Sequence, residues 1–299
     1  MNEPILHHPV MLEEVLNFLE PAPGAVYVDA TLGGASYSRA ILEKTNGRAT
    51  VVGLDRDLEA IEAASQRLSE YETFHAIHTE FSDLTNVLHS LGLEMIDGLV
   101  ADLGVSSPQF DRPERGFSLR HDGDIDMRMD ATQKTTAADI VNYEKQEELA
   151  RILWEYGEER FSRRLARRIV DRRKTKKFTS TVELADFIAA TIPGKRGHIH
   201  PATRTFQALR IATNNELAEL ECLCNQAEQT VKPSGVFICV SFHSLEDRLV
   251  KQAHRQRNQD GKPLWELLTR RPATPSADEK SVNPRSRSAK LRAARRLGP

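Results

Sequence analysis

Apolar runs and helical spacing alternate over the first hundred residues, and this order restricts the possible folds more than any other feature of the chain. Strands followed by helices in this way predict a parallel sheet with helices on both faces. The expected strands lie at 25–30, 49–54, 73–78 and 96–101, and the expected helices at 36–45, 57–68 and 81–91.

The pattern changes after residue 107. No convincing buried strand follows until about residue 213, and helical stretches are predicted at 137–143, 146–156, 159–173 and 182–191. The α/β pattern then resumes with a helix at 215–231, a turn at 232–235, a strand at 236–241, a helix at 245–255 and closing strands at 264–269 and 289–294. We therefore expect a discontinuous α/β domain, 1–107 and 214–299, with a helical insertion at 108–213.

A glycine turn, Gly33-Gly34, follows the first expected strand. In a doubly wound sheet such a turn lies at the carboxyl edge, where ligands bind, and glycine lets the backbone approach them closely. Asp55 ends the next strand, where a carboxylate can accept both hydroxyls of an adenosine ribose. Because the turn lacks the GxGxxG pattern of a pyrophosphate site, S-adenosylmethionine is favoured over NAD. A nicotinamide-dependent oxidoreductase is the alternative enzyme.

A second polar motif, DLGVSSPQ, begins at Asp102, the end of the fourth expected strand. Methyl transfer to nitrogen is an in-line displacement, so the enzyme must orient the acceptor and take up its proton. Asp102 and Ser106 suit these tasks. No cysteine follows this strand, which argues against the cysteine nucleophile used for methylation at a pyrimidine ring carbon.

A third motif, SFHSLEDR, follows the resumed strand and contains His243. The imidazole could position the acceptor or take its proton. The alternative is a purely structural role for the segment, with Ser244 capping a helix and Glu246 and Asp247 in its first turn.

Charge is distributed unevenly. Residues 1–100 hold 5 basic and 16 acidic side chains, which leaves 36 and 27 for the rest. Ten basic side chains lie in 160–177 and six in 285–296. This asymmetry predicts contact with a polyanion, and solvated helix faces are the alternative. The first of these segments overlaps the helix expected at 159–173. On this helix Phe161, Leu165 and Ile169 are expected to bury the face opposite its arginine side chains.

The sequence shows no clear signal for a metal site, a membrane span or secretion. His198 and His200 have no cysteine or acid at ligand spacing, so no metal is expected. No stretch approaches a membrane span and no secretory signal is visible, which predicts a cytoplasmic location. The sequence leaves the oligomeric state open.

Eleven sequence stretches, in order along the chain, form a recognisable set: HHPVMLEEV, DATLGG, GLDRD, EFSDL, DGLVADLGVSSPQ, ERGFS, DGDIDMRMD, YGEERFSRR, HPATRTFQALRI, SFHSLEDR and NPRSRSAKLR. Taken together, they resemble one family, the small-subunit ribosomal RNA cytosine-N(4) methyltransferases, also called the MraW family. The resemblance implies a Rossmann-like class I methyltransferase sheet with an inserted helical substrate-binding domain. It also implies that a cytosine amine in the decoding region is methylated.

The resemblance also assigns site residues. One departure affects them, because Ala35, Ser36 and Tyr37 stand where the family typically has Gly-Gly-His. The implied cofactor contacts are Gly33, Gly34, Ala35, Ser36, Tyr37, Asp55, Phe81, Asp102 and Gln109.

We therefore predict an S-adenosylmethionine-dependent enzyme that acts on small-subunit ribosomal RNA within the small subunit. An RNA-binding assembly factor with a decayed nucleotide fold is the non-enzymatic alternative. The catalytic candidates are Asp102, Ser106 and His243, and the candidates for RNA binding are Arg163, Arg164, Arg167, Arg168, Arg285 and Arg287.

Overall fold

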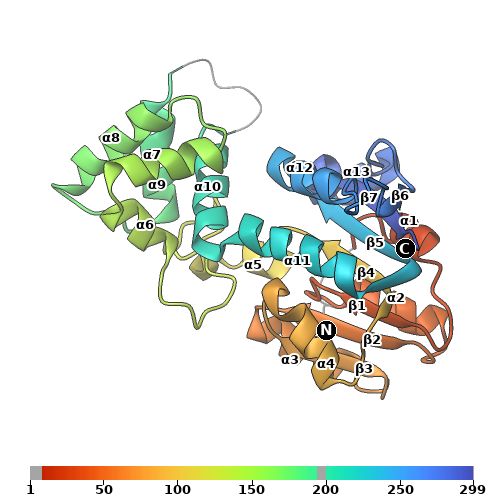
Figure 1. The fold of residues 1–299 in the computed structure, drawn as a ribbon. Coiled ribbons are helices and arrows are strands. Elements are labelled where there is room, and N and C mark those ends of the chain that lie inside the picture. The colour runs from red at the N-terminus through yellow and green to blue at the C-terminus, as the bar shows by residue number, and fades with distance from the viewer. Residues whose placement is uncertain (1–8, 194–199, 299) are drawn as a thin grey trace. The chain divides into compact units, whose positions relative to one another are not determined.

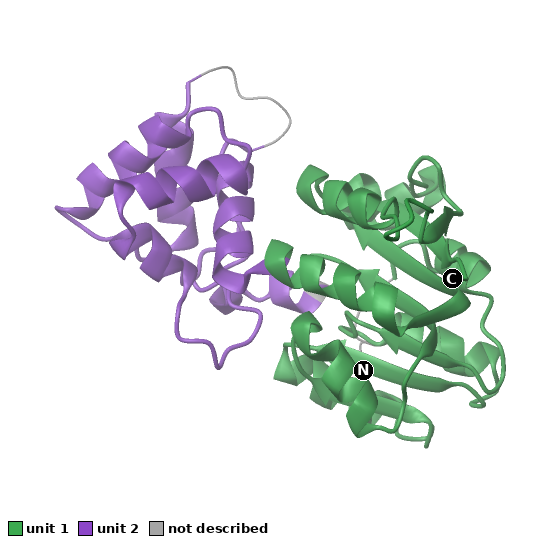
Figure 2. Ribbon diagram, viewed as in Figure 1, with its two compact units in different colours: residues 1–104, 217–299 green, residues 105–216 purple. Residues whose placement is uncertain are grey.

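The computed structural model describes residues 9–193 and 200–298, and the chain divides into two compact units (Figure 2). The first comprises 1–104 and 217–299, and the second 105–216. The predicted insertion, 108–213, is three residues shorter at each end. No helix in the described ranges is both long enough and apolar enough to cross a membrane.

The first unit is built on a sheet with the strand order β3-β2-β1-β4-β5-β7-β6. β1 to β5 pair in parallel, and β7 is antiparallel to both β5 and β6. This mixed order is typical of class I methyltransferases and confirms the predicted fold class. The strands are β1 (Val26–Asp29), β2 (Thr50–Asp55), β3 (Phe74–His78), β4 (Ile96–Asp102), β5 (Val231–Ser241), β6 (Trp265–Leu267) and β7 (Lys290–Arg296).

Helices cover both faces of the sheet (Figure 1). Successive strand residues point to opposite faces, so Val28 and Val52 lie in one core while Tyr27 and Val51 lie in the other. The helices of this unit are α1 (Leu12–Leu19), α2 (Ser36–Lys44), α3 (Leu58–Arg67), η1 (Phe81–Asp83), α4 (Leu84–Ser90), α11 (Glu216–Thr230), α12 (Ser244–Ala253), α13 (Ala277–Val282) and η3 (Pro284–Ser288).

One strand begins earlier than predicted. The expected turn at 232–235 lies within β5, because Val231 already pairs with Ile96 and Val236 pairs with Gly98. The irregular register between these pairs accommodates the turn-like residues as a bulge, with Ser234 at φ 70°.

The second unit is helical and has its own apolar core. All four predicted helices are present, and two more were not predicted: α5 (Ser107–Asp111) and α10 (Thr203–Asn214). α10 buries Phe206 and Leu209, yet no side chain caps its first turn, so the usual sequence signal for a helix start is missing. The remaining elements are η2 (Pro113–Arg115), α6 (Ala137–Tyr143), α7 (Gln146–Glu155), α8 (Ser162–Arg173) and α9 (Thr181–Thr191).

Candidate active site

Asp29, the last residue of β1, fastens the glycine turn to the sheet. Its Oδ2 accepts hydrogen bonds from Ser38 Oγ at 2.8 Å and from the Ser38 backbone N–H at 3.3 Å. Burial raises the pKa of Asp29 to about 6, against the lowering effect of the hydrogen bonds from Ser38 and Thr31. The start of α2 is therefore tied directly to the end of β1.

Asp55, the last residue of β2, lies against the same turn. Its Oδ2 accepts the Gly33 N–H at 2.8 Å, and its Oδ1 accepts the Asp57 N–H at 2.9 Å. Burial raises the pKa of Asp55. A carboxylate offers about four acceptor positions, so both oxygens can accept a further hydrogen bond. The structure thus brings together the predicted Gly33–Asp55 pair.

The glycine turn that follows β1 packs closely against β2, and this is possible because Gly53 of β2 has no side chain. The Leu32 N–H donates to Leu54 O at 2.9 Å, which joins the turn to β2. A Cβ at Gly53 would lie 2.5 Å from Leu32 Cδ1, so the buried Leu32 side chain occupies the space that any larger residue would need.

Asp102, at the end of β4, has an unusual carboxyl group. Its backbone N–H donates to Thr31 Oγ1 at 2.6 Å, but its buried Oδ1 has no partner among the described residues. Burial and then the Asp29 charge raise the pKa of Asp102 well above its ordinary value, while the Tyr37 hydroxyl lowers it in part. A buried acceptor without a partner is costly unless a ligand supplies the donor.

Tyr37 occupies the position of the family's usual histidine, and its side chain belongs to the core. The phenol donates to Val10 O at 2.5 Å. Ala35, also buried, takes a left-handed conformation with φ 60°, and Ser36 begins α2. The side chain of Tyr37 is therefore committed to the fold, and the backbone is what the turn can offer a ligand.

Phe81 lies at the carboxyl end of β3, where it begins η1. Its ring packs against the core, and its carbonyl accepts Gln226 Nε2 at 2.7 Å. The implied cofactor contacts of the first unit therefore lie at the carboxyl ends of neighbouring parallel strands.

His243, which follows β5, is itself the N-cap of α12, so the alternative that placed the cap at Ser244 is wrong. Its Nδ1 accepts the Glu246 N–H at 3.3 Å. Its Nε2 lies 3.1 Å from Glu246 Oε1, without the geometry of a hydrogen bond. The imidazole is thus held in place by the helix that it caps.

The two acids of the same motif have structural partners. Glu246 is buried, and its Oε2 accepts the N–H groups of Phe242 and His243. Asp247 Oδ1 accepts Arg292 Nε at 2.7 Å. Burial raises the pKa of Asp247, but Arg292 and Lys290 outweigh it, so the pKa lies below its ordinary value.

Ser106 and Gln109 belong to the second unit, where they form a capping box at the start of α5. The Gln109 N–H donates to Ser106 Oγ at 3.5 Å, and the Ser106 N–H donates to Gln109 Oε1 at 3.1 Å. Both residues therefore have a local structural role.

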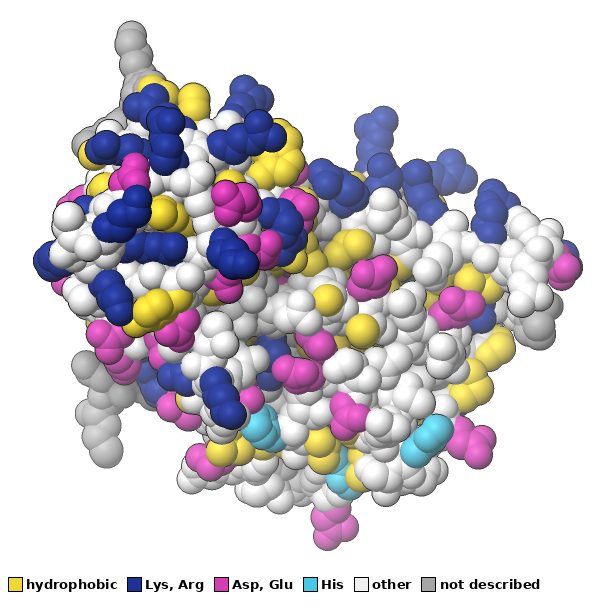
Figure 3. All heavy atoms as spheres, turned by 60° about the vertical axis from the view of Figure 1, so that its left-hand side comes forward, with side chains coloured by type: hydrophobic (Ala, Val, Ile, Leu, Met, Phe, Trp, Pro, Cys, Tyr) yellow, Lys and Arg dark blue, Asp and Glu magenta, His cyan; other side chains and the backbone are white. Residues whose placement is uncertain are grey.

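The basic segment 160–177 divides into two halves. In its second half, Arg172 pairs with Glu183, and Arg173 donates to the carbonyls of Val141 and Glu144. The first half differs, because within the described ranges no ion pair is found for its exposed side chains: Arg160, Arg163, Arg164, Arg167 and Arg168. Figure 3 shows Lys and Arg side chains gathered on the surface of this helical unit.

The apolar face of α8 is only partly as predicted. Leu165 and Ile169 are fully buried, but Phe161 is 38% exposed. Two acids near the arginines have other partners, since Glu148 pairs with Arg151 and Glu159 accepts the Phe161 N–H.

The second basic segment, 285–296, is mostly structural. Four of its six basic residues lie in β7, where Arg292 pairs with Asp247 and Arg295 with Glu266. It is therefore a sheet strand and not a free tail, and only Arg285 and Arg287 lie outside it, exposed in η3. Of the two histidines weighed as metal ligands, His198 lies outside the described residues, and His200 Nδ1 accepts the Ala202 N–H at 3.2 Å.

Comparison with known proteins bears on this arrangement. The family model described as the MraW methylase family matches residues 4–297. The chain belongs to this family. It is 48% identical to ribosomal RNA small subunit methyltransferase H of Gloeothece citriformis, over 97% of this chain and 94% of that one. It is 47% identical to the protein of the same name from Geobacter sulfurreducens, over 97% and 99%.

Solved structures are more distant. The putative rRNA-methylase from Clostridium thermocellum aligns with a TM-score of 0.48 at 9% identity, covering 98% of this chain and all of that one. Family membership, which does not depend on this alignment, makes the protein an S-adenosylmethionine-dependent methyltransferase. It excludes the oxidoreductase and the non-enzymatic assembly factor.

The residues at the strand ends fit this cofactor. S-adenosylmethionine carries a sulfonium and an ammonium group, and the carboxyl groups of Asp29, Asp55 and Asp102 end three adjacent strands. Burial raises the pKa of each, so a bound cation would relieve the cost of ionising them. The buried Asp102 Oδ1 still requires a donor.

Proposed function

We propose that this protein transfers a methyl group from S-adenosylmethionine to the exocyclic N(4) amine of a cytosine in the decoding region of small-subunit ribosomal RNA. Its relatives are named ribosomal RNA small subunit methyltransferase H. The observation that carries the proposal is the pair formed by the Gly33 turn and Asp55, together with the buried Asp102 Oδ1, which has no partner among the described residues.

We assign the cofactor contacts to the following residues of this chain. Asp55 accepts the ribose hydroxyls, and the backbone of residues 33–37 lies along the cofactor, with Phe81 and Gln109 as further contacts. When bound, the cofactor supplies an electrophilic methyl group on its sulfonium.

Asp102, Ser106 and His243 orient the amine and receive its proton. A raised pKa makes the Asp102 carboxylate the stronger proton acceptor, since it favours the protonated form. The imidazole of His243, fixed at the start of α12, positions the base.

Exposed arginine side chains bind the RNA. We assign Arg163, Arg164, Arg167 and Arg168 of α8, with Arg285 and Arg287 of η3, to phosphate contacts. In this division 1–107 and 214–299 hold the cofactor, with Gln109 as an added contact, and 108–213 recognises RNA, with Arg285 and Arg287 as added contacts. The target base must be unstacked for its amine to reach the methyl group. Because ribosomal subunits are cytoplasmic, the proposed reaction takes place there.

The test is transfer of a radiolabelled methyl group from the cofactor to purified small subunits that lack the modification. Naked small-subunit RNA and large subunits serve as comparisons. We expect label in small-subunit RNA and none in large subunits. Label in large subunits, or in neither subunit, would refute the proposed substrate.

A further inference from the structure

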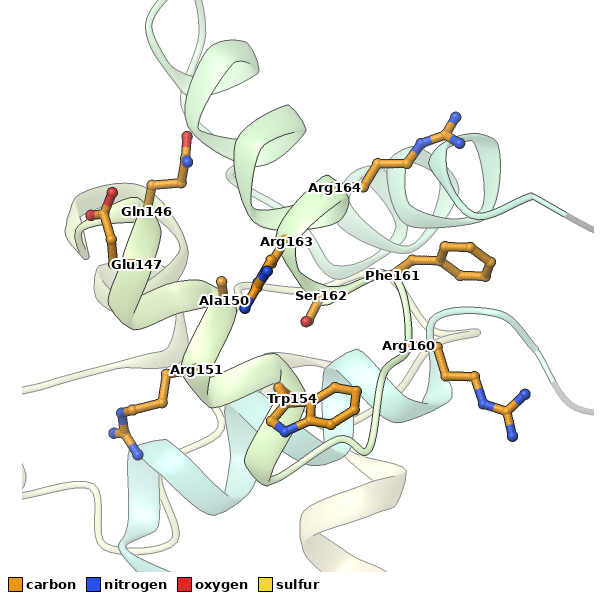
Figure 4. A pocket seen from close by; sticks show the side chains of 10 residues that line it. All are labelled: Gln146, Glu147, Ala150, Arg151, Trp154, Arg160, Phe161, Ser162, Arg163 and Arg164. Atoms are coloured by element: carbon orange, nitrogen blue, oxygen red, sulfur yellow. The ribbon is translucent and has the colours of Figure 1, made fainter.

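A groove of about 820 Å³ lies in the second unit, between α7 and the start of α8. It is lined by side chains from both segments (Figure 4). Figure 4 shows Trp154 projecting from α7, and Arg160 and Phe161 from the residues just before α8. All of these side chains belong to one unit, so the groove is formed within a single compact body.

Two aromatic rings in this groove are exposed. Trp154 is 59% exposed and Phe161 is 38% exposed. Aromatic side chains of this size gain most of their stabilisation from burial, so two exposed rings beside one groove indicate a surface that is covered by a partner.

The charge of the groove indicates what that partner is. Arg160, Arg163 and Arg164 line it, and within the described ranges none of them takes part in an ion pair. Arg151 also lines it but is neutralised by Glu148 and Glu155 of its own helix. Glu147 is the one acid among the residues that line the groove. The groove therefore presents free guanidinium groups next to flat apolar rings.

We propose that this groove binds unpaired nucleotides of the RNA substrate, with bases stacked on Trp154 and Phe161 and phosphates on Arg160, Arg163 and Arg164. The inference rests on the proposed function and extends it, because it names single-stranded RNA as the form that the second unit recognises. Stacking on an aromatic ring requires an exposed base face, which a duplex hides. An acidic protein segment would use the arginines but would leave the flat rings without a matching partner.

Tryptophan emission gives a direct readout. The chain has two tryptophans, and Trp265 is only 3% exposed and packs against Phe237 and His254. A change in emission when RNA is added therefore reports on Trp154. The probe is a short single-stranded oligocytidylate, compared with a duplex RNA of the same length.

We expect the single strand to quench the emission, and Trp154→Phe to abolish the quenching while retaining most of the affinity. Because Trp154→Ala removes the reporting ring, its Kd is measured by filter binding of the labelled oligonucleotide. That Kd should rise about 5- to 150-fold for the single strand, the factor set by one lost stacking contact. The matched control is Tyr143→Ala on α6, since Tyr143 is 63% exposed but does not line the groove, and it should leave the Kd unchanged.

Three results would overturn the groove as an RNA site: an unchanged Kd for Trp154→Ala, an equal loss for Tyr143→Ala, or stronger quenching by the duplex. Methyl transfer to small subunits by the unsubstituted protein separates this inference from the proposed function. If label enters the RNA while Trp154→Ala binds normally, the groove is refuted and the function stands. If no label enters while the quenching and the loss of affinity hold, the function is refuted and the groove stands as an RNA site.

Discussion

Among single residues, Asp55 has the most direct link to the cofactor, since it already holds the Gly33 N–H. We predict that Asp55→Ala weakens S-adenosylmethionine binding by roughly 10- to 150-fold, because a hydrogen bond to a charged group contributes about 1.5–3 kcal/mol. Calorimetric titration measures the loss. Glu94→Ala, which removes an exposed acid just before β4, is the control and should not change the affinity. Equal affinity for Asp55→Ala and the unsubstituted protein would refute the cofactor assignment.

His243 combines a structural and a proposed chemical role, and substitution can separate them. Asparagine is a good N-cap but has no imidazole. We therefore predict that His243→Asn keeps the thermal stability and cofactor affinity while slowing methyl transfer in single-turnover experiments. His243→Ala should in addition lose about 1 kcal/mol of stability, because the cap of α12 is removed. If His243→Asn transfers methyl groups at the normal rate, the residue is only a cap.

At the scale of elements, α8 carries the prediction about phosphates. Replacing both Arg163 and Arg167 with Gln should weaken RNA binding similarly for different sequences. It should also reduce the slope of log affinity against log salt by about one unit per lost contact. Lys174→Gln is the control, because Lys174 caps the same helix and already pairs with Asp171. A slope unaltered by the double substitution would place the RNA surface away from α8, with Arg285 and Arg287 as the remaining assigned contacts.

Elements with strong local signals were predictable, and those fixed by tertiary contacts were not. Periodic apolar spacing located α6 and α9 to within one residue, and the strand ends at Asp55 and Asp102 followed from apolar runs. The start of α10 has no cap, but α7 and α8 lack one too and were predicted, so the missing cap alone does not explain why the sequence did not indicate α10. The extension of β5 was missed because Lys232-Pro233-Ser234-Gly235 has the composition of a turn, and only pairing with Ile96 makes it part of a strand.

Tertiary contacts also limited what the sequence could predict about the candidate site. Sequence motifs indicated which acids meet the glycine turn, but not which are engaged elsewhere. The ion pair of Asp247 with Arg292 joins residues 45 positions apart, and a linear pattern carries no sign of it. Exposure of Phe161 likewise depends on how the chain enters α8, which helical spacing does not specify.

For the whole molecule, burial of Asp29 predicts a pH dependence of stability. Its pKa is about 6 in the fold against 3.8 ordinarily, so its contribution to stability is fully present below pH 3.8 and is lost as the pH rises through 6. We predict that Asp29→Asn, which cannot ionise, gains free energy of unfolding relative to the unsubstituted protein between pH 4 and 7. The gain is up to about 3 kcal/mol. Denaturant titration of the cofactor-free protein measures it, and a difference independent of pH would contradict the prediction.

The central claim concerns the methylated atom, and nucleoside analysis tests it most directly. Small-subunit RNA labelled by the protein is digested to nucleosides, and the product is identified by chromatography and mass spectrometry against authentic standards. The account predicts that the label comigrates with N(4)-methylcytidine. Label in 5-methylcytidine, in a methylated purine or on a ribose hydroxyl would contradict it.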